Sequence, residues 1–275
     1  PTDPNERRCD YRYDGKTYGE IWGFETDRLF THDDFTWDEQ GNITGYAPGV
    51  ADQQYLVDQY KQSGFDFLPG DVKYKDLNGD GQIDDGRTNG VPTLDNHGDM
   101  TVIGNTTPRY QYGVRLDLSW RNFDLGVFFQ GVGKRDLWGT GQLVIPGWHY
   151  GEAYYTHHMD YWTEDNTDAF YPRPWALNYQ SANPNFKKQT RYLLNMAYCR
   201  LKNLTVGYTL PETLTRRAMI QRLRFYASFE NLVTWDHLNN VPIDPETRTA
   251  TGDGGYIGRS YPFSREFSFG LQVTF

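Results

Sequence analysis

The chain has 275 residues and a formal net charge of −9, and 16% of its residues are aromatic, including 8 Trp and 21 Tyr. No run of about 18 apolar residues occurs, which excludes a transmembrane helix. It does not exclude membrane strands, because apolar and polar residues alternate in these and their mean hydropathy is low. Acidic residues are concentrated in residues 1–100, with 21 Asp and Glu against 9 Lys and Arg, which argues against nucleic acid as a partner and for bound cations or solvation.

The first 70 residues show little sustained periodicity. They begin PTDPNERRCDYRYDG, without an initiator Met or an export segment, so we expect a C-terminal piece of a longer protein whose export signal lies upstream. Residues 15–24 include a short strand pattern, and residues 52–62 space their apolar side chains as a short surface helix does. Cys9 and Cys199 could pair in an exported chain, although unpaired, partly buried thiols fit their spacing better.

Residues 71–99 contain the sharpest local motif, which matches a calcium loop of the EF-hand type. Oxygen side chains alternate from Asp76 onward, Gly81 permits the sharp turn, and Ile83 pins the loop to a neighbour. Arg87 stands where the bidentate acid is normally found, and Asp99, after an inserted stretch, is its natural substitute. The alternative is a string of Asn-Gly and Asp-Gly turns that holds no ion. The predicted ligands of a structural calcium are Asp76, Asn78, Asp80, Gln82 through its carbonyl, Asp84 and Asp99.

From residue 108 the pattern changes to strands. Apolar and polar side chains alternate over residues 110–118 and again over 123–130, which predicts a hairpin with a tight turn at 120–122. Arg115 and Asp117 lie on the same polar face of this hairpin. Two charges on one face suit a water-filled lumen better than a dry core.

Residues 132–191 form a long aperiodic excursion, which is typical of a functional loop. Its rings could stack on sugars or pack against a partner, although each one could equally fold the loop onto itself. The rings considered are Trp138, Trp148, Tyr150, Trp162, Tyr171 and Trp175. His149, His157 and His158 invite a zinc hypothesis, which we discount because no Cys or carboxylate falls at ligand spacing.

Three further strands are predicted at residues 197–210, 223–234 and 265–275. The last reads REFSFGLQVTF, with apolar side chains at every odd position from Phe267 to Phe275 and polar ones or Gly at the even positions. In the first of the three, Arg200 and Lys202 fall on the apolar face, so either that end rises above the lipid or a bulge shifts the register.

The connections between these strands alternate between short and long, as they do in outer-membrane barrels. We therefore predict an all-β fold: the C-terminal strands of a large antiparallel transmembrane β-barrel, as a fragment of a longer chain. Residues 1–109 are expected to form an extracellular loop region that carries the calcium-type loop. Residues 110–275 are expected to form barrel strands in contact with outer-membrane lipid, with long extracellular loops at 132–191 and 235–264.

Five segments carry a resemblance to a known family. They are PGDVKYKDLNGDGQID, VIGNTTPRYQYGVRLDLSWRNFDLGVFFQGVGKRD, RYLLNMAYCRLKNLTVGYTLP, LRFYASFENLVTW and SYPFSREFSFGLQVTF. Together they resemble the C-terminal end of SusC/RagA-type TonB-linked outer-membrane proteins. The resemblance implies a 22-stranded, plugged barrel in the outer membrane, energised by TonB through a missing N-terminal part. It also implies a SusD-like surface lipoprotein partner that helps capture oligosaccharide or peptide substrates.

The first function hypothesis is thus a TonB-dependent importer. The alternative is a secreted, calcium-stabilised carbohydrate-binding β-sandwich, in which the apolar strand faces would be buried against a second layer. A surface glycoside hydrolase is a third possibility, but no pair of acids is placed as acid and nucleophile, so we predict that the chain is not an enzyme.

Overall fold

A computed structural model describes residues 15–59, 65–88, 90, 93–148, 154–175, 183–238, 241–246 and 261–275. The chain divides into two compact units. Unit 1 comprises residues 1–107, 136–194 and 249–257, and unit 2 comprises 108–135, 195–248 and 258–275. None of the helices among these described residues is long and apolar enough to cross a membrane.

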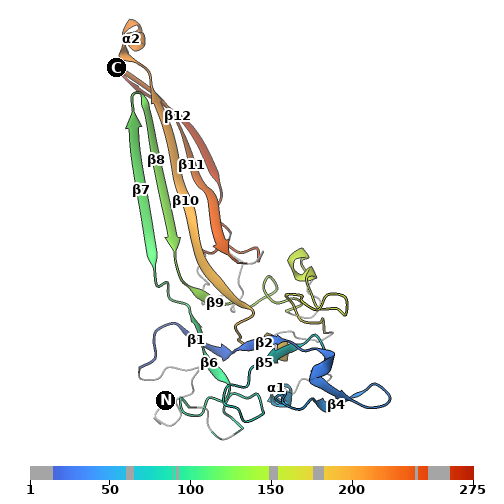
Figure 1. Cartoon of the computed structure of the whole chain (residues 1–275). Coiled ribbons are helices and arrows are strands. Elements are labelled where there is room, and N and C mark those ends of the chain that lie inside the picture. The colour runs from blue at the N-terminus through green and yellow to red at the C-terminus, as the bar shows by residue number, and fades with distance from the viewer. Residues whose placement is uncertain are drawn as a thin grey trace. The chain divides into compact units, whose positions relative to one another are not determined.

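Unit 2 is built on one antiparallel sheet (Figure 1). Its strands are β7 (Gln111–Trp120), β8 (Phe123–Val132), β10 (Leu193–Thr209), β11 (Arg222–His237) and β12 (Glu266–Thr274). They lie in the order β12-β11-β10-β8-β7. The five strands predicted in this part of the chain are therefore confirmed, since each alternating segment became a strand with ends within a few residues of those expected.

The connections on one side of this sheet are short. β7 and β8 pair up to Trp120↔Phe123, so the turn is only two residues long, and Arg121 adopts a left-handed φ of 54° within it. Residues between β10 and β11 form α2 (Glu212–Thr215) and a 3-10 helix, η6 (Arg216–Ala218). Glu212 and Arg216 pair across one helical turn at 3.0 Å, which is a surface interaction of small energetic weight.

The apolar face of this sheet is open. In β12, Phe267 is 59% exposed, Phe269 80% and Leu271 56%, and every residue of β7 is exposed. No second layer of the described residues covers these side chains. The carbohydrate-binding sandwich considered above requires this face to be buried in a core, which the described residues do not provide. A continuous exposed face of Phe, Leu and Val is what lipid contact requires.

A bulge in β10 explains the two basic residues that interrupt its pattern. Pairing with β8 steps from Leu201↔Phe129 to Asn203↔Phe128, so Lys202 is an extra residue and the strand changes face at that point. Arg200 thereby joins the polar face, and its side chain is only 3% exposed. Of the two predicted explanations, the bulge is confirmed.

Arg200 is buried but fully paired. Its guanidinium donates to Asp244 and to Glu246, each at 2.7 Å, and to the Thr234 hydroxyl at 2.8 Å. Lys202 also reaches Glu246 at 2.7 Å. Burial raises the pKa of Asp244, but the hydrogen bond from Arg200 and main-chain amides outweigh it, so the net pKa is lowered and the carboxylate stays charged.

The polar face uses glycine to make room for long side chains. A Cβ added to Gly207 would lie 2.4 Å from Asp124 and 2.5 Å from Arg224, whose ion pair spans β10 at that point. A Cβ at Gly270 would lie 2.2 Å from the ring of Tyr226, its direct partner on β11. The alternation of glycine with large polar residues therefore follows from packing on this face.

Unit 1 contains short strands joined by long loops. β1 (Glu20–Phe24) pairs with β6 (Met100–Asn105), β2 (Thr26–Leu29) with β5 (Val72–Tyr74), and β3 (Phe35–Trp37) with β4 (Ile43–Tyr46). The remaining elements are α1 (Gln54–Gln59), η2 (His32–Asp34), β9 (Asp136–Trp138), η3 (Thr156–Met159) and η5 (Pro184–Phe186). The strand in residues 15–24 and the helix in 52–62 are confirmed in shorter form. The other strands, of three to six residues, were not predicted.

Buried side-chain amides hold these short strands in place. Gln53, with no exposure, donates to the Val72 carbonyl at 3.0 Å and accepts from the Tyr74 amide at 2.7 Å. Asn185, equally buried, accepts from the Val72 amide at 2.8 Å. Two amide side chains thus satisfy the main chain of β5 on behalf of a missing sheet neighbour.

The aperiodic excursion between β8 and β10 contributes to this unit. Residues 136–194 cluster with residues 1–107, and the first division between the units falls between Thr107 and Pro108. Most of the predicted loop 132–191 therefore packs with the N-terminal part of the chain. Much of the other predicted loop, 235–264, lies outside the described residues.

Candidate functional site

The first half of the calcium-type loop has the local geometry of a cation loop. Asp76 accepts from the amides of Gly79 and Gly81 at 2.6 and 2.9 Å, and the carboxylate thereby fixes the turn. Asn78 accepts from the Asp80 amide at 2.9 Å, and Asp80 accepts from the Gln82 amide at the same distance. These hydrogen bonds give residues 76–82 a tight turn, and whether the turn holds an ion stays a prediction.

The other two predicted ligands turn toward main-chain donors. Asp84 accepts from the Gly86 amide at 2.5 Å and from the Thr88 hydroxyl. Asp99 is fully buried, and its two oxygens accept from the amides of Leu77 at 2.7 Å and Asp84 at 2.9 Å. Burial raises the pKa of Asp99, and the nearby charge of Asp76 adds to the rise. Asp99 therefore holds the base of the loop through main-chain amides, and its predicted role as a calcium ligand in place of the acid missing at Arg87 stays a prediction.

A calcium ion therefore fits only part of the predicted ligand set. Among the described residues, no three His, Cys, Asp or Glu side chains gather closely enough to hold a metal ion. Arg87, at the position of the missing acid, pairs with Asp85 at 3.2 Å. Ile83 is fully buried and its amide donates to the Asp52 carbonyl at 2.8 Å, so it anchors the loop as predicted.

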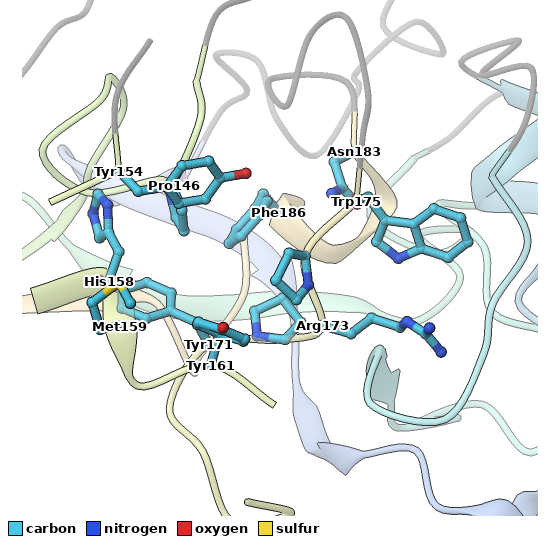
Figure 2. Close-up of a pocket in the computed structure, with 12 residues that line it drawn as sticks. Pro146, Tyr154, His158, Met159, Tyr161, Tyr171, Arg173, Trp175, Asn183 and Phe186 are labelled. Atoms are coloured by element: carbon cyan, nitrogen blue, oxygen red, sulfur yellow. The ribbon is translucent and has the colours of Figure 1, made fainter. Parts of the chain in front are cut away.

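A second site lies in the aromatic excursion of unit 1. It is a pocket of about 370 Å³ with a predominantly apolar lining (Figure 2). The lining residues are Pro146, Tyr154, His158, Met159, Tyr161, Tyr171, Pro172, Arg173, Pro174, Trp175, Asn183 and Phe186. Figure 2 shows His158 and Met159 toward one end of the pocket and Trp175 and Arg173 toward the other. A pocket of this volume and lining suits a small organic ligand or one residue of a longer one.

The floor of this pocket is ordered by stacked rings. Tyr171 is 3% exposed and lies parallel to Tyr192, with ring centroids 5.8 Å apart and an angle of 10°. Tyr192 in turn packs on Phe186 at 5.3 Å. Burial raises the pKa of both tyrosines above the ordinary value, so both phenols remain neutral. Tyr154 and Met159, exposed by 49% and 61%, form the rim.

His158 also belongs to this floor and is 1% exposed. Its Nδ1 accepts from the Tyr155 amide at 3.3 Å, whereas Nε2 has no hydrogen-bond partner in the described part of the chain. Burial, with a smaller contribution from the charge of His157, lowers the pKa of His158 to about 4, so the ring is neutral.

The far wall of the pocket is tied to a buried carboxylate. Asp71 is fully buried and accepts from the Trp175 indole and the Asn185 amide group, both at 2.7 Å, and from the Leu68 amide at 2.8 Å. Burial raises the pKa of Asp71 to about 7, against the opposing effect of these donors. Arg173 donates to the Pro69 carbonyl at 3.1 Å and lies over the Trp175 ring. This network fixes the orientation of Trp175.

Sequence reasoning identified part of this pocket. Tyr171 and Trp175 were among the rings considered for ligand stacking, and both line it; Trp162 packs beside Arg173. His157 and His158 stand next to each other with ring centroids 4.1 Å apart, and His158 proves to be a pocket residue, which the zinc hypothesis did not suggest. His149 and Tyr150 lie outside the described residues, as does Cys9, whereas Cys199 is a half-buried free thiol.

Comparisons with known proteins identify the relatives of the chain. No family model matches it. TonB-dependent receptor P3 of Formosa agariphila is 32% identical over 214 residues, covering 75% of this chain and 19% of that receptor. TonB-dependent receptor P26 of the same organism is 26% identical over 249 residues, covering 87% of this chain and 22% of the receptor. The chain therefore spans about a fifth of the length of these curated relatives.

Solved structures show the same fold. The RagAB peptide transporter matches with a TM-score of 0.53 and 21% identity, over 93% of this chain and 22% of the transporter chain. The RagAB peptide importer in its open-open state matches with a TM-score of 0.52 and 20% identity, over 96% and 24%. The resemblance to SusC/RagA-type TonB-linked proteins and the all-β barrel fold class are thereby confirmed. The curated relatives are receptors rather than enzymes.

Proposed function

Because the chain belongs to the TonB-dependent receptors, we propose that it supplies barrel strands and an external loop region of an outer-membrane nutrient importer. The observation that carries this proposal is the sheet of unit 2, whose apolar face is exposed on the outer strands β7 and β12 and half-buried over much of β8, β10 and β11, with no second layer over it among the described residues. Such a face is stable against lipid and unstable in water. Import requires no chemical step on the substrate, so the absence of an acid and nucleophile pair from the sequence pattern agrees with it.

The cargo that we propose is an oligosaccharide or an oligopeptide. RagAB, which shares the fold, is a peptide transporter, and this supports the peptide alternative. A SusD-like surface lipoprotein is the proposed partner in capture, and TonB is the proposed source of energy through parts of the receptor outside this chain. Aromatic rings on the external loops can contact either kind of cargo.

Import is tested on the full-length receptor in cells. We expect it in the outer-membrane fraction, and we expect uptake of fluorescently labelled oligopeptides or oligosaccharides to stop when the gene or TonB is removed. Uptake that continues without TonB, or a receptor found in the soluble fraction, would contradict the proposal.

We also propose a structural calcium ion in the loop 76–82. Asp76, Asn78 and Asp80, with the Gln82 carbonyl, would hold it, and water would complete the coordination shell, since Asp84 and Asp99 are buried whereas Asn78 and Asp80 are exposed. The ion would offset the repulsion between the two nearby carboxylates. It has no proposed role in transport.

Chelation tests the calcium proposal. Removing calcium with EGTA should increase protease cleavage within residues 76–99 and leave the barrel folded. The variant Asp80→Asn should lose this response, while Asp33→Asn, at an exposed position of η2 in the same unit, should keep it. Cleavage that is equal with and without calcium would count against the site.

A further inference from the structure

The short connections of unit 2 carry exposed arginines that have no acidic partner. Arg121 lies in the turn between β7 and β8, and Arg217 and Arg222 lie at the connection between β10 and β11. The Thr209 amide donates to the Asn122 carbonyl at 2.8 Å, so both connections leave the sheet at the same end (Figure 1). Among the described residues, no acid lies within ion-pair distance of these three guanidinium groups, whereas the two other arginines at this end are paired. Three positive charges therefore remain for an anion from outside the described chain.

The connection between β10 and β11 also exposes large apolar side chains. Leu214 is 62% exposed and Met219 is 86% exposed. Met219 adopts a left-handed φ of 56° at the end of η6, a position that Gly or Asn usually occupies. An apolar side chain held there gains nothing in water. Exposed basic and apolar side chains within one short segment are typical of a surface that lies on a membrane of anionic lipid.

The apolar face of the sheet has a row of rings near this end. Trp120 pairs with Phe123, which pairs in turn with Tyr208. Tyr208 pairs with Phe225 on its other side, so four adjacent strands each place one ring at the same level. Aromatic rows of this kind lie at the boundary between the hydrocarbon and the headgroups of a membrane. Residues 210–222 lie beyond this row, on the headgroup side.

A ring at the far end of β11 lies at the distance of the opposite boundary. Trp235 is 53% exposed, and its ring centroid is 6.5 Å from that of Phe129 on the apolar face. It stands ten positions after Phe225 in the same strand. Ten positions of a strand tilted by about 40° rise roughly 25 Å, which is the height of the apolar band of outer-membrane barrels. Residues 210–222 therefore fall at the level of lipid headgroups.

We infer that residues 210–222 anchor the receptor on the inner leaflet of the outer membrane, with Arg217 and Arg222 bound to the phosphates of anionic glycerophospholipids. Leu214 and Met219 enter the apolar layer beneath those headgroups. Short connections of outer-membrane barrels lie on the periplasmic side, which selects the inner leaflet. A zwitterionic lipid has the same phosphate but no net charge, so phosphatidylglycerol should be preferred to phosphatidylcholine. Because lipid surrounds these residues only in a membrane-inserted barrel, the inference rests on the proposed function.

Photo-crosslinking from the anchor itself tests which lipid lies there. The full-length receptor carries benzoylphenylalanine in place of Met219 and is inserted into vesicles of equimolar phosphatidylglycerol and phosphatidylcholine with identical acyl chains. Mass spectrometry then gives the ratio of the two lipids among the crosslinked products. We expect phosphatidylglycerol to exceed phosphatidylcholine by about fivefold.

Variants at exposed positions separate the charges from the apolar contacts. Arg217→Gln combined with Arg222→Gln should bring the lipid ratio close to one. Arg265→Gln, an exposed arginine just before β12 and at the opposite end of the sheet, is the matched control and should leave the ratio unchanged. Leu214→Ser should lower the yield of both crosslinked lipids without changing their ratio. The shift of the folded barrel on an unheated gel checks that each variant folds.

Three results would overturn the inference. They are equal crosslinking of the two lipids in the receptor with both arginines, a ratio that does not change in the double arginine variant, and crosslinks to protein alone. The last of these would show that position 219 contacts a protein partner in place of lipid.

Failure of the anchor is distinguishable from failure of import. If the receptor lies in the outer membrane and uptake depends on TonB, but the crosslinked lipids show no preference, the anchor is wrong and import stands. If the crosslinks to phosphatidylglycerol depend on the two arginines but uptake continues without TonB, the import function is wrong and the anchor stands.

Discussion

The two units of this chain reach order by different means. In unit 2, strands of 9–17 residues pair along their length, and their side chains divide by simple alternation into an open apolar face and a polar face. In unit 1, strands of three to six residues are completed by buried side chains from distant segments, such as Asn185 on Val72. The stability of unit 2 therefore depends on the solvent around its sheet, and the stability of unit 1 depends on single buried polar groups.

The largest loss of stability should follow when one such buried polar side chain of unit 1 is replaced. Asn185→Leu leaves the Val72 amide without its acceptor and removes a donor from buried Asp71, so we expect a loss of about 2–5 kcal/mol in the local stability of unit 1. Hydrogen exchange of residues 65–75 in the full-length protein measures it. Asn42→Leu, in an exposed turn, is the control and should have little effect. Equal protection in both variants would mean that β5 is held by other contacts.

A charge on the lipid face should damage unit 2 alone. Leu271→Arg should cost about 2–4 kcal/mol if the residue lies near the membrane midplane, whereas Ser268→Arg on the polar face should cost much less. The measurement is the folded fraction in lipid vesicles, followed by the shift of the folded barrel on an unheated gel. Identical folded fractions of the two variants would show that lipid does not contact one face of the sheet in preference to the other.

The stability of unit 1 should depend on pH because of the titration of Asp71. Its pKa is about 7 in the folded state, above that of an unfolded Asp near 3.8. The contribution of Asp71 to the stability is therefore fully present below pH 3.8 and is lost as the pH rises through 7. The slope is at most about 1.4 kcal/mol per pH unit. Hydrogen exchange of residues 65–75 between pH 4 and 8 measures it. Asp71→Asn should flatten the slope and exposed Asp66→Asn should not; a slope that persists in Asp71→Asn would assign it to another group.

The smallest effect concerns glycine on the polar face. Gly270→Ala places a methyl group against the Tyr226 ring, which can shift, so we expect a loss of about 1 kcal/mol. In the double variant with Tyr226→Ser the added cost should disappear. Equilibrium unfolding in urea with lipid vesicles gives the coupling between the two positions. If the losses in unfolding free energy of the two single variants simply add, Gly270 is not needed to make room for the Tyr226 ring.

The sequence predicted unit 2 well because its information is local. Alternation over ten residues identifies a strand whatever lies beside it, and even the bulge at Lys202 was visible as two basic residues out of phase. Unit 1 was mostly missed because a strand as short as Phe35–Trp37 leaves no period. In addition, some of its strands are completed by side chains more than a hundred positions away, such as Asn185 on Val72.

The two candidate sites differ in the same way in how far the sequence predicts them. The turn from Asp76 to Gln82 was readable because its hydrogen bonds span two to five residues. The aromatic pocket was not, since Pro146, His158 and Phe186 meet only through tertiary packing. His158 was noticed for its chemistry, but its burial against Tyr155 and Tyr171 cannot be inferred from spacing.

The most direct test concerns the surroundings of adjacent residues on β12. In a Cys9→Ser, Cys199→Ser background, nitroxide labels at Leu271→Cys and at Gln272→Cys are compared by EPR for their collisions with oxygen and with a water-soluble nickel complex. We predict that the label at 271 collides mainly with oxygen, as in hydrocarbon, and that the label at 272 collides mainly with nickel. Equal accessibility of both labels to nickel, or the reverse assignment, would contradict a membrane-spanning sheet.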